Sequence, residues 1–406
     1  MKPASNTEGT PWGTVVLLGS LTALGPISID LYLPSLPAIG ADLYASPSQT
    51  QATVAAFLAG MGVGQLIYGP ASDRLGRKPP ILFGIAVYLA ATVACGLATT
   101  PTMLIAGRFV QALGVSAGSV ISRAMVRDRF GHTETARVLS LLLLIMGVAP
   151  ILAPLGGGLL LAAGGWRMNF WFMAAYGFAV GAAILLRMRE SRSAETLAQA
   201  RGEHPLRAYI SLLKERPLVG YALASALNGA TLFTYISGSP DLLIKTYGVP
   251  PWAFGLVFGL NTAGLIGASQ INRRLLRRHT PDRILARSTL VTVGFGVALM
   301  FVSVTGVGGQ WSVLPLLFCM ISSRGFVQGN TMACALNVDL RRSGSISALM
   351  GSCGFASGAV ASAAAGMLYN GTPGPMAAVM LVASIGAAMA IRFLTRPEIR
   401  PADSQP

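Results

Sequence analysis

Residues 15–36 read VVLLGSLTALGPISIDLYLPSL, and Asp30 is the only charged residue in this stretch. A helix needs roughly 20 apolar residues to cross the hydrocarbon core of a bilayer, so the stretch predicts a membrane span, expected near 14–37. A carboxylate inside such a span costs about 2.5–3.5 kcal/mol and normally faces a protein interior or a water-filled cavity. Asp30, expected at mid-membrane depth, therefore indicates a protein that moves protons, ions or solutes.

The same apolar pattern recurs along the whole chain. Only 11% of the 406 residues are charged and 53% are hydrophobic, whereas soluble domains carry about 25% charged residues. The predicted fold class is therefore an all-α polytopic membrane protein with twelve transmembrane helices. The eleven further spans are expected near 50–72, 80–98, 101–124, 137–162, 166–187, 217–245, 251–272, 283–305, 311–335, 345–369 and 374–395.

The net charge of +15 would suit a nucleic-acid-binding protein, but the positions of the basic residues exclude that class. Most Lys and Arg residues fall in the N-terminal tail and in every second loop between spans, which is the positive-inside pattern. We therefore expect a multi-pass protein of a bacterial inner membrane, with both termini in the cytoplasm. The exceptions to the pattern are Arg108, Arg167, Lys245 and Arg324.

One long polar segment divides the spans six and six. Residues 188–216 are rich in Arg, Glu, Ala and Ser and predict a cytosolic linker. Two domains follow from this division: an N-terminal six-helix bundle at 1–187 and a C-terminal six-helix bundle at 217–406.

The two halves resemble each other. GQLIYGPASDRLGRK at 64–78 aligns with GLIGASQINRRLLRR at 264–278, and RFVQ at 108–111 echoes RGFVQ at 324–328. Parallel six-span repeats are a transporter design that places the substrate site at the interface of the repeats.

The segment GPASDRLGRK at 69–78 closes the second span on the cytosolic side. Gly76 suits a tight turn, and Asp73 stands near a helix C-terminus, where the helix dipole disfavours a negative charge. Asp73 should therefore have a partner, either Arg123 or Arg127 or the helix start near 343–345. The predicted cytosolic gate comprises Gly69, Asp73, Arg74, Gly76, Arg77, Lys78, Arg123, Arg127 and Asp128.

Several motifs together resemble a known family. The segment 69–78 resembles the signature loop of the major facilitator superfamily, RFVQALG at 108–114 resembles its helix-four signature, and GVAPILAPLGG at 147–157 resembles its helix-five antiporter signature, with Ala153 where Gly usually precedes Pro. The motifs DLYLPSLP at 30–37, RAMVRD at 123–128 and YISGSP at 235–240 resemble the bicyclomycin and chloramphenicol resistance (Bcr/CflA) subfamily of drug–proton antiporters. The likeness spans about residues 14–395.

The resemblance implies a fold of two six-helix bundles and roles for particular residues. Asp30 would be the proton and substrate site, with Arg108 orienting it or relaying protons. Burial makes a carboxylate harder to ionise and a nearby guanidinium makes it easier, so such a pair can be tuned to gain and lose a proton; a structural ion pair is the alternative. In the helix-five seam of Gly147, Pro150, Pro154 and Gly157, small residues and proline kinks would seal the site against leakage.

Polar, aromatic and Met residues within the spans are candidates for the substrate cavity, because such side chains accommodate several drug shapes. Each of them is equally suited to helix packing. Asp241 and Lys245 are expected to form a surface helix pair rather than a gate, and Arg324 to have a structural role. The cavity candidates are Tyr32, Phe57, Gln111, Met146, Asn228, Tyr235, Asn261 and Gln328.

The function predicted from these features is proton-coupled efflux of small drug-like molecules by alternating access, carried out by a monomer. Export of a polar metabolite, such as a nucleoside or amino acid, is the alternative. An enzyme is not expected, because His132, His204 and His279 all lie in loops and the four cysteines lie within spans. For the same reason we expect no metal site and no cofactor.

Overall fold

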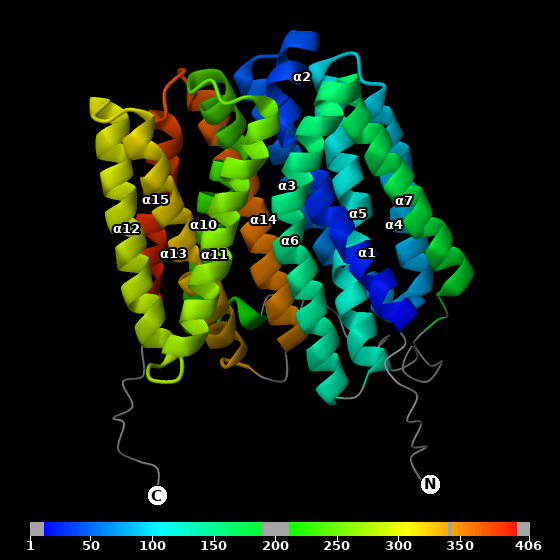
Figure 1. Cartoon of the computed structure of the whole chain (residues 1–406). Helices are drawn as coiled ribbons and strands as arrows, with labels where there is room; N and C mark the ends of the chain where they lie inside the picture. The colour runs from blue at the N-terminus through cyan, green and yellow to red at the C-terminus, as the bar shows by residue number, and fades with distance from the viewer. Residues whose placement is uncertain (1–11, 131, 189, 191–210, 340–342, 396–406) are drawn as a thin grey trace, which may run out of the picture.

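The computed structural model describes residues 12–130, 132–188, 190, 211–339 and 343–395, and in this part of the chain twelve long helices stand side by side (Figure 1). They match the twelve predicted spans to within a few residues. Their bounds are α1 Trp12–Asp30, α3 Pro47–Leu75, α4 Lys78–Gly96, α5 Pro101–Arg129, α6 His132–Gly164, α7 Arg167–Arg187, α10 Arg216–Pro240, α11 Pro251–Leu275, α12 Pro281–Thr305, α13 Gln310–Leu336, α14 Ser343–Leu368 and α15 Gly374–Leu394.

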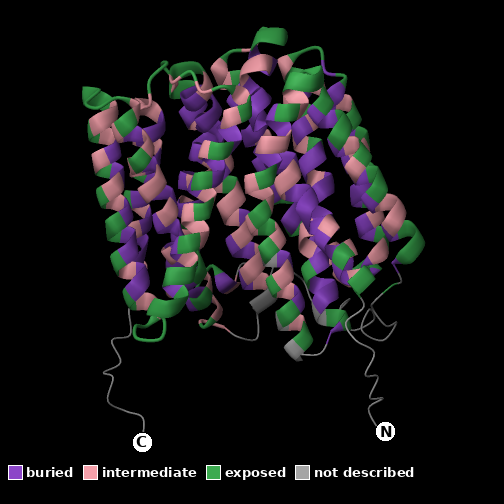
Figure 2. Ribbon diagram, viewed as in Figure 1, coloured by how far each residue is buried: buried purple, intermediate pink, exposed green. Residues whose placement is uncertain are grey.

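The outer surface of the helices is apolar, as a bilayer requires. Ten of the helical segments described are long and apolar enough to cross a membrane. Large hydrophobic side chains such as Phe83, Leu159, Phe178, Leu290 and Phe301 are exposed, and a soluble monomer rarely shows so much apolar surface. Figure 2 shows exposed residues recurring along the outward faces of the helices, with buried residues behind them.

The helices form two groups that correspond to the two halves of the sequence. Helices α1 and α3–α7 pack mainly on one another, as do α10–α15. The halves meet along two long contacts, α3 with α14 and α6 with α11. The predicted fold class is confirmed. Most of the predicted linker lies outside the described residues, so the domain boundaries stay a prediction.

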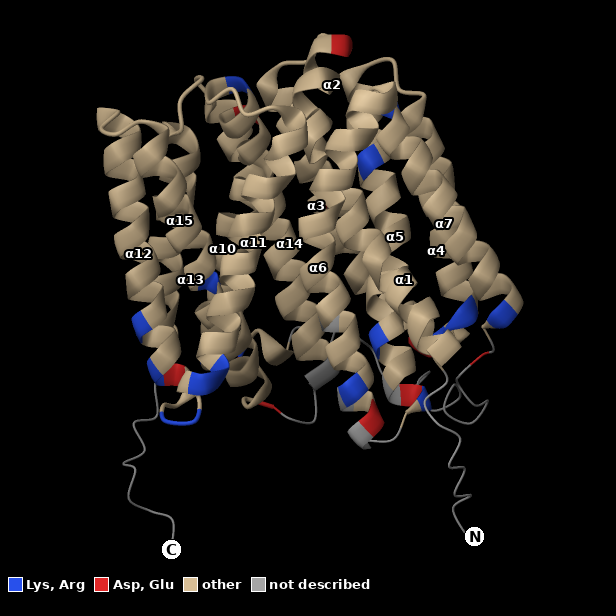
Figure 3. Cartoon of the chain, viewed as in Figure 1, with Lys and Arg blue, Asp and Glu red and all other residues tan. Residues whose placement is uncertain are grey.

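Two opposite faces of the bundle differ in charge. We call the end at which α1 begins and α15 ends the terminal face, and the opposite end, which carries α2 (Leu36–Asp42), the far face. Figure 3 shows Lys and Arg side chains gathered mainly at the terminal face. The charge asymmetry expected from the sequence is therefore present, while the side of the membrane on which each face lies stays a prediction.

The first span, expected near 14–37, is broken within these bounds. Helix α1 ends at Asp30, a 3₁₀ turn (η1) covers Leu33–Ser35, and α2 continues from Leu36. Pro34 and Pro37 explain the break, because proline removes a backbone donor and disfavours helical geometry in the residue before it. Asn169 of α7 fixes the turn by donating to the Ser35 hydroxyl at 2.7 Å.

The seventh span changes its helical form at the matching place. Helix α10 ends at Pro240 and is followed by a π-helical turn, η2, at Asp241–Thr246. The two irregular ends meet across the halves: η1 contacts α10 and α11, and α2 contacts η2. The halves are therefore in contact at the far face.

Candidate functional site

Asp30 lies at the C-terminal end of α1 and is only 4% exposed. In the part of the chain that the structure describes, no donor or cation lies within bonding distance of its carboxylate. Neither carboxylate oxygen is completely buried, so both remain accessible from the space between the neighbouring side chains. Asp30 also lies close enough to act electrostatically on Tyr235 of α10. The carboxylate thus stands where the two halves meet.

Arg108 of α5 is fully buried beside the end of α1. Its guanidinium donates to the Ser28 carbonyl at 2.8 Å and to Gln111 Oε1 at 2.5 Å. The Tyr32 and Phe57 rings lie 4.1 Å and 4.2 Å from its carbon Cζ, close enough for cation–π attraction. A cation bonded to a carbonyl in the last turn of a helix is favoured by the helix dipole. Arg108 therefore fixes the end of α1 two residues before Asp30.

Asp30 and Arg108 form no ion pair in this structure, so the structural ion pair that the sequence left open is absent here. The guanidinium is instead held by aromatic rings and neutral acceptors. Gln111 extends this arrangement by donating to the Thr92 hydroxyl at 2.8 Å, and Ser28 donates to the Tyr88 hydroxyl at 3.0 Å. Arg108 can thus position the backbone that carries the carboxylate without neutralising it.

Along the helix axes the site lies away from the centre of the bundle, while its depth in a bilayer stays a prediction. Helix α5 begins at Pro101 on the far face, and Arg108 follows seven residues later, which is about 10 Å along a helix. A hydrocarbon core is about 30 Å thick. Because Arg108 donates to the Ser28 carbonyl, the end of α1 lies at the same level along the bundle. The site therefore lies nearer to the far face.

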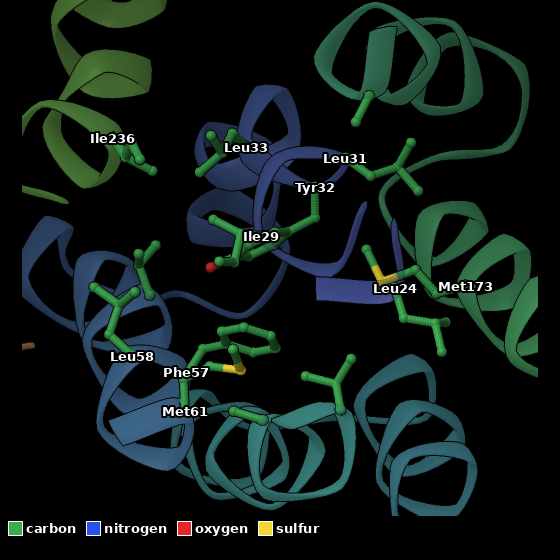
Figure 4. Close-up of a cluster of buried hydrophobic side chains, with 14 of the residues drawn as sticks. Leu24, Ile29, Leu31, Tyr32, Leu33, Phe57, Leu58, Met61, Met173 and Ile236 are labelled. Atoms are coloured by element: carbon green, nitrogen blue, oxygen red, sulfur yellow. The ribbon is translucent and has the colours of Figure 1, made fainter. Parts of the chain in front are cut away.

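The first cavity candidates do gather around Arg108. Tyr32 Oη lies 3.0 Å from the Thr53 hydroxyl, and Tyr32 and Phe57 are completely buried. Figure 4 shows Tyr32, Phe57, Leu58 and Met61 pointing into one cluster, with Ile236 of α10 on the opposite side. This wall of the site is therefore apolar and aromatic.

The candidates of the C-terminal half form two pairs. Asn261 donates to the Tyr235 hydroxyl at 2.8 Å, and Tyr235 stacks on Phe258 with ring centroids 5.5 Å apart. Asn228 accepts a hydrogen bond from Arg324 at 2.9 Å, which gives the buried guanidinium a structural partner. The contacts with Asn261 and Phe258 hold Tyr235 in place near Asp30.

Met146 and Gln328 are exposed rather than gathered at the site. Because both side chains are exposed in this conformation, contacts give no reason to group them with Tyr32 and Arg108. Their membership of a substrate cavity stays a prediction.

The predicted gate loop forms a compact charged cluster at the terminal face. Arg77 is 5% exposed and lies 2.9 Å from Asp73 and 2.8 Å from Asp128. Burial would lower the pKa of the Arg77 guanidinium, but the hydrogen bonds and charges of Asp128 and Asp73 raise that pKa above its ordinary value. Asp73 therefore has a partner within its own segment, one that the sequence analysis did not name. The side chain of Arg127 lies outside the described part.

Glu190 completes this cluster and was missed. Its carboxylate accepts from the backbone N–H groups of Arg77 and Lys78 at 2.9–3.0 Å, where α4 begins, and the helix dipole favours a negative charge there. Gly76 has φ +87°, and a Cβ there would lie 2.8 Å from the same carboxylate. The expected turn is confirmed, and the charged sequence after α7 was the available signal for Glu190.

The helix-five seam packs against both halves. A Cβ at Gly157 would overlap the Leu31 carbonyl oxygen, and a Cβ at Gly158 would lie 2.8 Å from the Pro251 carbonyl oxygen of α11. Helix α6 contains Pro150 and Pro154 and remains continuous. The small residues therefore allow α6 to touch the broken end of α1 and the C-terminal half together.

Asp241 joins the two halves at the far face, so its expected role as a surface pair is wrong. Its side chain is 1% exposed, Lys245 lies 2.7 Å from one oxygen, and Gln51 of α3 donates to the other at 2.9 Å. The spacing of Asp241 and Lys245 gave the pair correctly, but it could not show that the π-helical turn presents Asp241 to the other half. Among the described residues there is no His, Cys, Asp and Glu cluster that could hold a metal.

Comparison with known proteins points to a membrane transporter, as the two groups of six helices do. The family model of the Major Facilitator Superfamily matches residues 18–363. The chain is 36% identical to the uncharacterized MFS-type transporter YdgK of Bacillus subtilis over 94% of this chain and 95% of that protein. It is 29% identical to a bicyclomycin resistance protein homolog of Haemophilus influenzae, over 97% and 99% respectively.

A third relative is the multidrug resistance protein MdtL of Escherichia coli, which is 34% identical over 69% of this chain and 71% of that protein. The fold is also that of a solved D-xylose-proton symporter, with a TM-score of 0.74 at 12% identity over 95% of this chain and 98% of that chain. The chain is thus a multi-pass membrane transporter that belongs to the major facilitator superfamily, and its relatives confirm the resemblance to the Bcr/CflA drug antiporter subfamily.

Proposed function

We propose that this transporter exports small drug-like molecules, of the chloramphenicol or bicyclomycin type, in exchange for protons. The carboxylate of Asp30 carries the proposal. It is buried between the halves, and among the described residues no cation or donor holds it as an anion. Such a group can bind either a proton or a donor group of a substrate. Mutual exclusion at one site would make the exchange obligatory.

The environment of Asp30 fits this exchange. Tyr235 of the C-terminal half lies near the carboxylate, the aromatic rings of Tyr32 and Phe57 surround Arg108 in the N-terminal half, and Arg108 holds the end of α1 in place. The drug-resistance names of the relatives favour this substrate class. We further propose that the terminal face, with both chain ends, lies in the cytoplasm, and that one chain suffices because it contains both halves.

One proton per cycle supplies enough energy for useful export. A charge moving through 100 mV releases about 2.3 kcal/mol, and one pH unit adds about 1.4 kcal/mol. Together these allow a neutral substrate to be held at a roughly 500-fold gradient. Exchange of one proton for one uncharged drug would therefore be sufficient to protect a cell.

The test is substrate-induced proton release by the purified protein in weakly buffered detergent, with chloramphenicol and bicyclomycin as probes. The wild type should release protons on drug addition, and Asp30→Asn should release none. Reconstituted vesicles should show the same contrast in efflux driven by a pH gradient. Asp42→Asn is the matched control, because Asp42 is an exposed acid on α2 that accepts from Trp166 at 3.0 Å and from Arg167 at 2.7 Å, and the amide oxygen of Asn can still accept both hydrogen bonds.

Undiminished proton release or pH-driven efflux in Asp30→Asn would refute the role of Asp30. A wild type that binds and exports a nucleoside or amino acid but neither antibiotic would instead support the polar-metabolite exporter. Membrane insertion and a single size-exclusion peak show that each variant is folded.

A further inference from the structure

A groove in the C-terminal half lies apart from the site of Asp30. Its volume is about 660 Å³, within the range of about 300–1,000 Å³ that holds small molecules in proteins. Helices α11 and α12 form its two sides, and α13, which packs on both, forms its floor. Figure 1 shows α13 behind the space between α11 and α12.

The walls of the groove are apolar along most of their length. Ile271 and Leu275 of α11 and Val291 of α12 are exposed at its rim, and Phe318 and Phe326 of α13 lie deeper. On each side the lining residues recur at helical spacing of three or four, so each helix gives one stripe to the groove. A long apolar chain would be covered by these stripes.

The charge of the groove is confined to one end. His279, Arg283 and Arg287 line it where α12 begins, at the terminal face. Arg283 and Arg287 are four residues apart and therefore share one helix face. Within the described ranges neither has an ion-pair partner. The nearest acid in the sequence, Asp282, does not line the groove and accepts from Tyr221 at 2.8 Å.

The aligned helices of the N-terminal half differ from the groove at one position of the sequence alignment. Tyr68 of α3 is buried, and its hydroxyl approaches α4 to within 3.4 Å of a Cβ built at Gly84. The aligned residue in the C-terminal half is Ala268, which lines the groove. A large side chain that bridges two helices in one half is thus replaced by a methyl group in the other.

We propose that this groove binds one anionic phospholipid, with an acyl chain along α11, α12 and α13 and the phosphate between Arg283 and Arg287. Cationic pockets between transmembrane helices bind anionic headgroups, and a guanidinium recognises phosphate through a fork of donors. A zwitterionic lipid such as phosphatidylethanolamine carries the same phosphate, but its ammonium group neutralises that phosphate and repels the two guanidinium groups. The occupant is therefore distinguished by its headgroup, while the apolar walls accept any chain.

The test is native mass spectrometry of the full protein, extracted in mild detergent from vesicles of phosphatidylethanolamine and phosphatidylglycerol with identical acyl chains. The wild type should retain one phosphatidylglycerol in preference to phosphatidylethanolamine. The double variant Arg283→Gln/Arg287→Gln should bind it about 30-fold more weakly, at roughly 1 kcal/mol for each Arg. The matched control, Arg277→Gln/Arg278→Gln, removes the same charge from the adjacent loop between α11 and α12, outside the groove, and should retain the lipid.

A second variant tests the apolar part without a change of charge. Gly267 is exposed in the groove, and nothing lies within 4 Å of a Cβ built there, so Gly267→Phe should fill the space without strain and reduce phosphatidylglycerol retention. Equal retention of both lipids by the wild type would overturn the proposal. Equal loss in the control pair, or unchanged lipid retention together with reduced antibiotic binding in Gly267→Phe, would overturn it as well.

Discussion

Gln51→Ala should shift the transporter towards a conformation that is open at the far face. Gln51 donates at 2.9 Å to Asp241, which is 1% exposed, so the variant leaves a buried carboxylate oxygen without its donor. A hydrogen bond to a charged group contributes about 1.5–3 kcal/mol. Water replaces the donor once the far face opens, so this loss falls on the closed state alone. The closed-to-open ratio should therefore fall by about 10- to 150-fold.

The change is measurable as a distance distribution across the far face. Labels at Thr99→Cys, after α4, and Val307→Cys, after α12, report the separation of the halves, with the four native cysteines replaced by alanine. Double electron–electron resonance or single-molecule energy transfer then gives both populations. A closed population of about 99% would fall to between roughly 90% and 40% in Gln51→Ala.

Gln270→Ala is the control for this experiment. Gln270 is exposed on α11, and its loss should leave the distribution unchanged. A population shift of less than threefold in Gln51→Ala, or an equal shift in Gln270→Ala, would show that Asp241 is not a contact that holds the far face closed.

Two further substitutions test the terminal face and the helix-five seam. Glu190→Ala should lower the free energy of unfolding by about 1–2 kcal/mol, because the carboxylate accepts from the first N–H groups of α4; Glu190→Gln, which keeps an acceptor, should lose less. Thermal unfolding in detergent measures both, and a stability equal to wild type in Glu190→Ala would contradict this capping role. Gly157→Ala should cost about 1–3 kcal/mol and reduce drug resistance, because its methyl group would overlap the Leu31 carbonyl oxygen. In Gly156→Ala the nearest atom would lie 3.7 Å away, so this neighbour should keep wild-type resistance in a growth assay; equal effects of the two substitutions would contradict close packing at Gly157.

The sequence predicted those features that depend on local composition or spacing. A stretch of about 20 apolar residues has to form a helix in a membrane, because no water satisfies its backbone there, and this places all twelve spans. Gly76 was expected in a tight turn because it lies between a helix end and a basic run, and the structure gives it φ +87°. Charge distribution predicted the basic terminal face by the same local reasoning.

Features that depend on how segments meet were missed or placed wrongly. Asp241 and Lys245 could be paired from their spacing, but the contact with Gln51 joins residues 190 positions apart. Contact between Asp30 and Arg108 could not be predicted from the sequence, and in the structure the guanidinium contacts the Ser28 carbonyl and two aromatic rings. Glu190 could not be distinguished from the other charges of the polar segment that follows α7.

The sequence by itself determined that this chain is a membrane transporter with an acid inside its first span, because hydropathy and signature motifs are properties of consecutive residues. Only the tertiary structure decided that the first span breaks after Asp30, that Arg108 fixes this end without neutralising the acid, and that Asp241 joins the halves. Each of these depends on directions and distances between helices far apart in the chain, which periodicity along one helix does not contain.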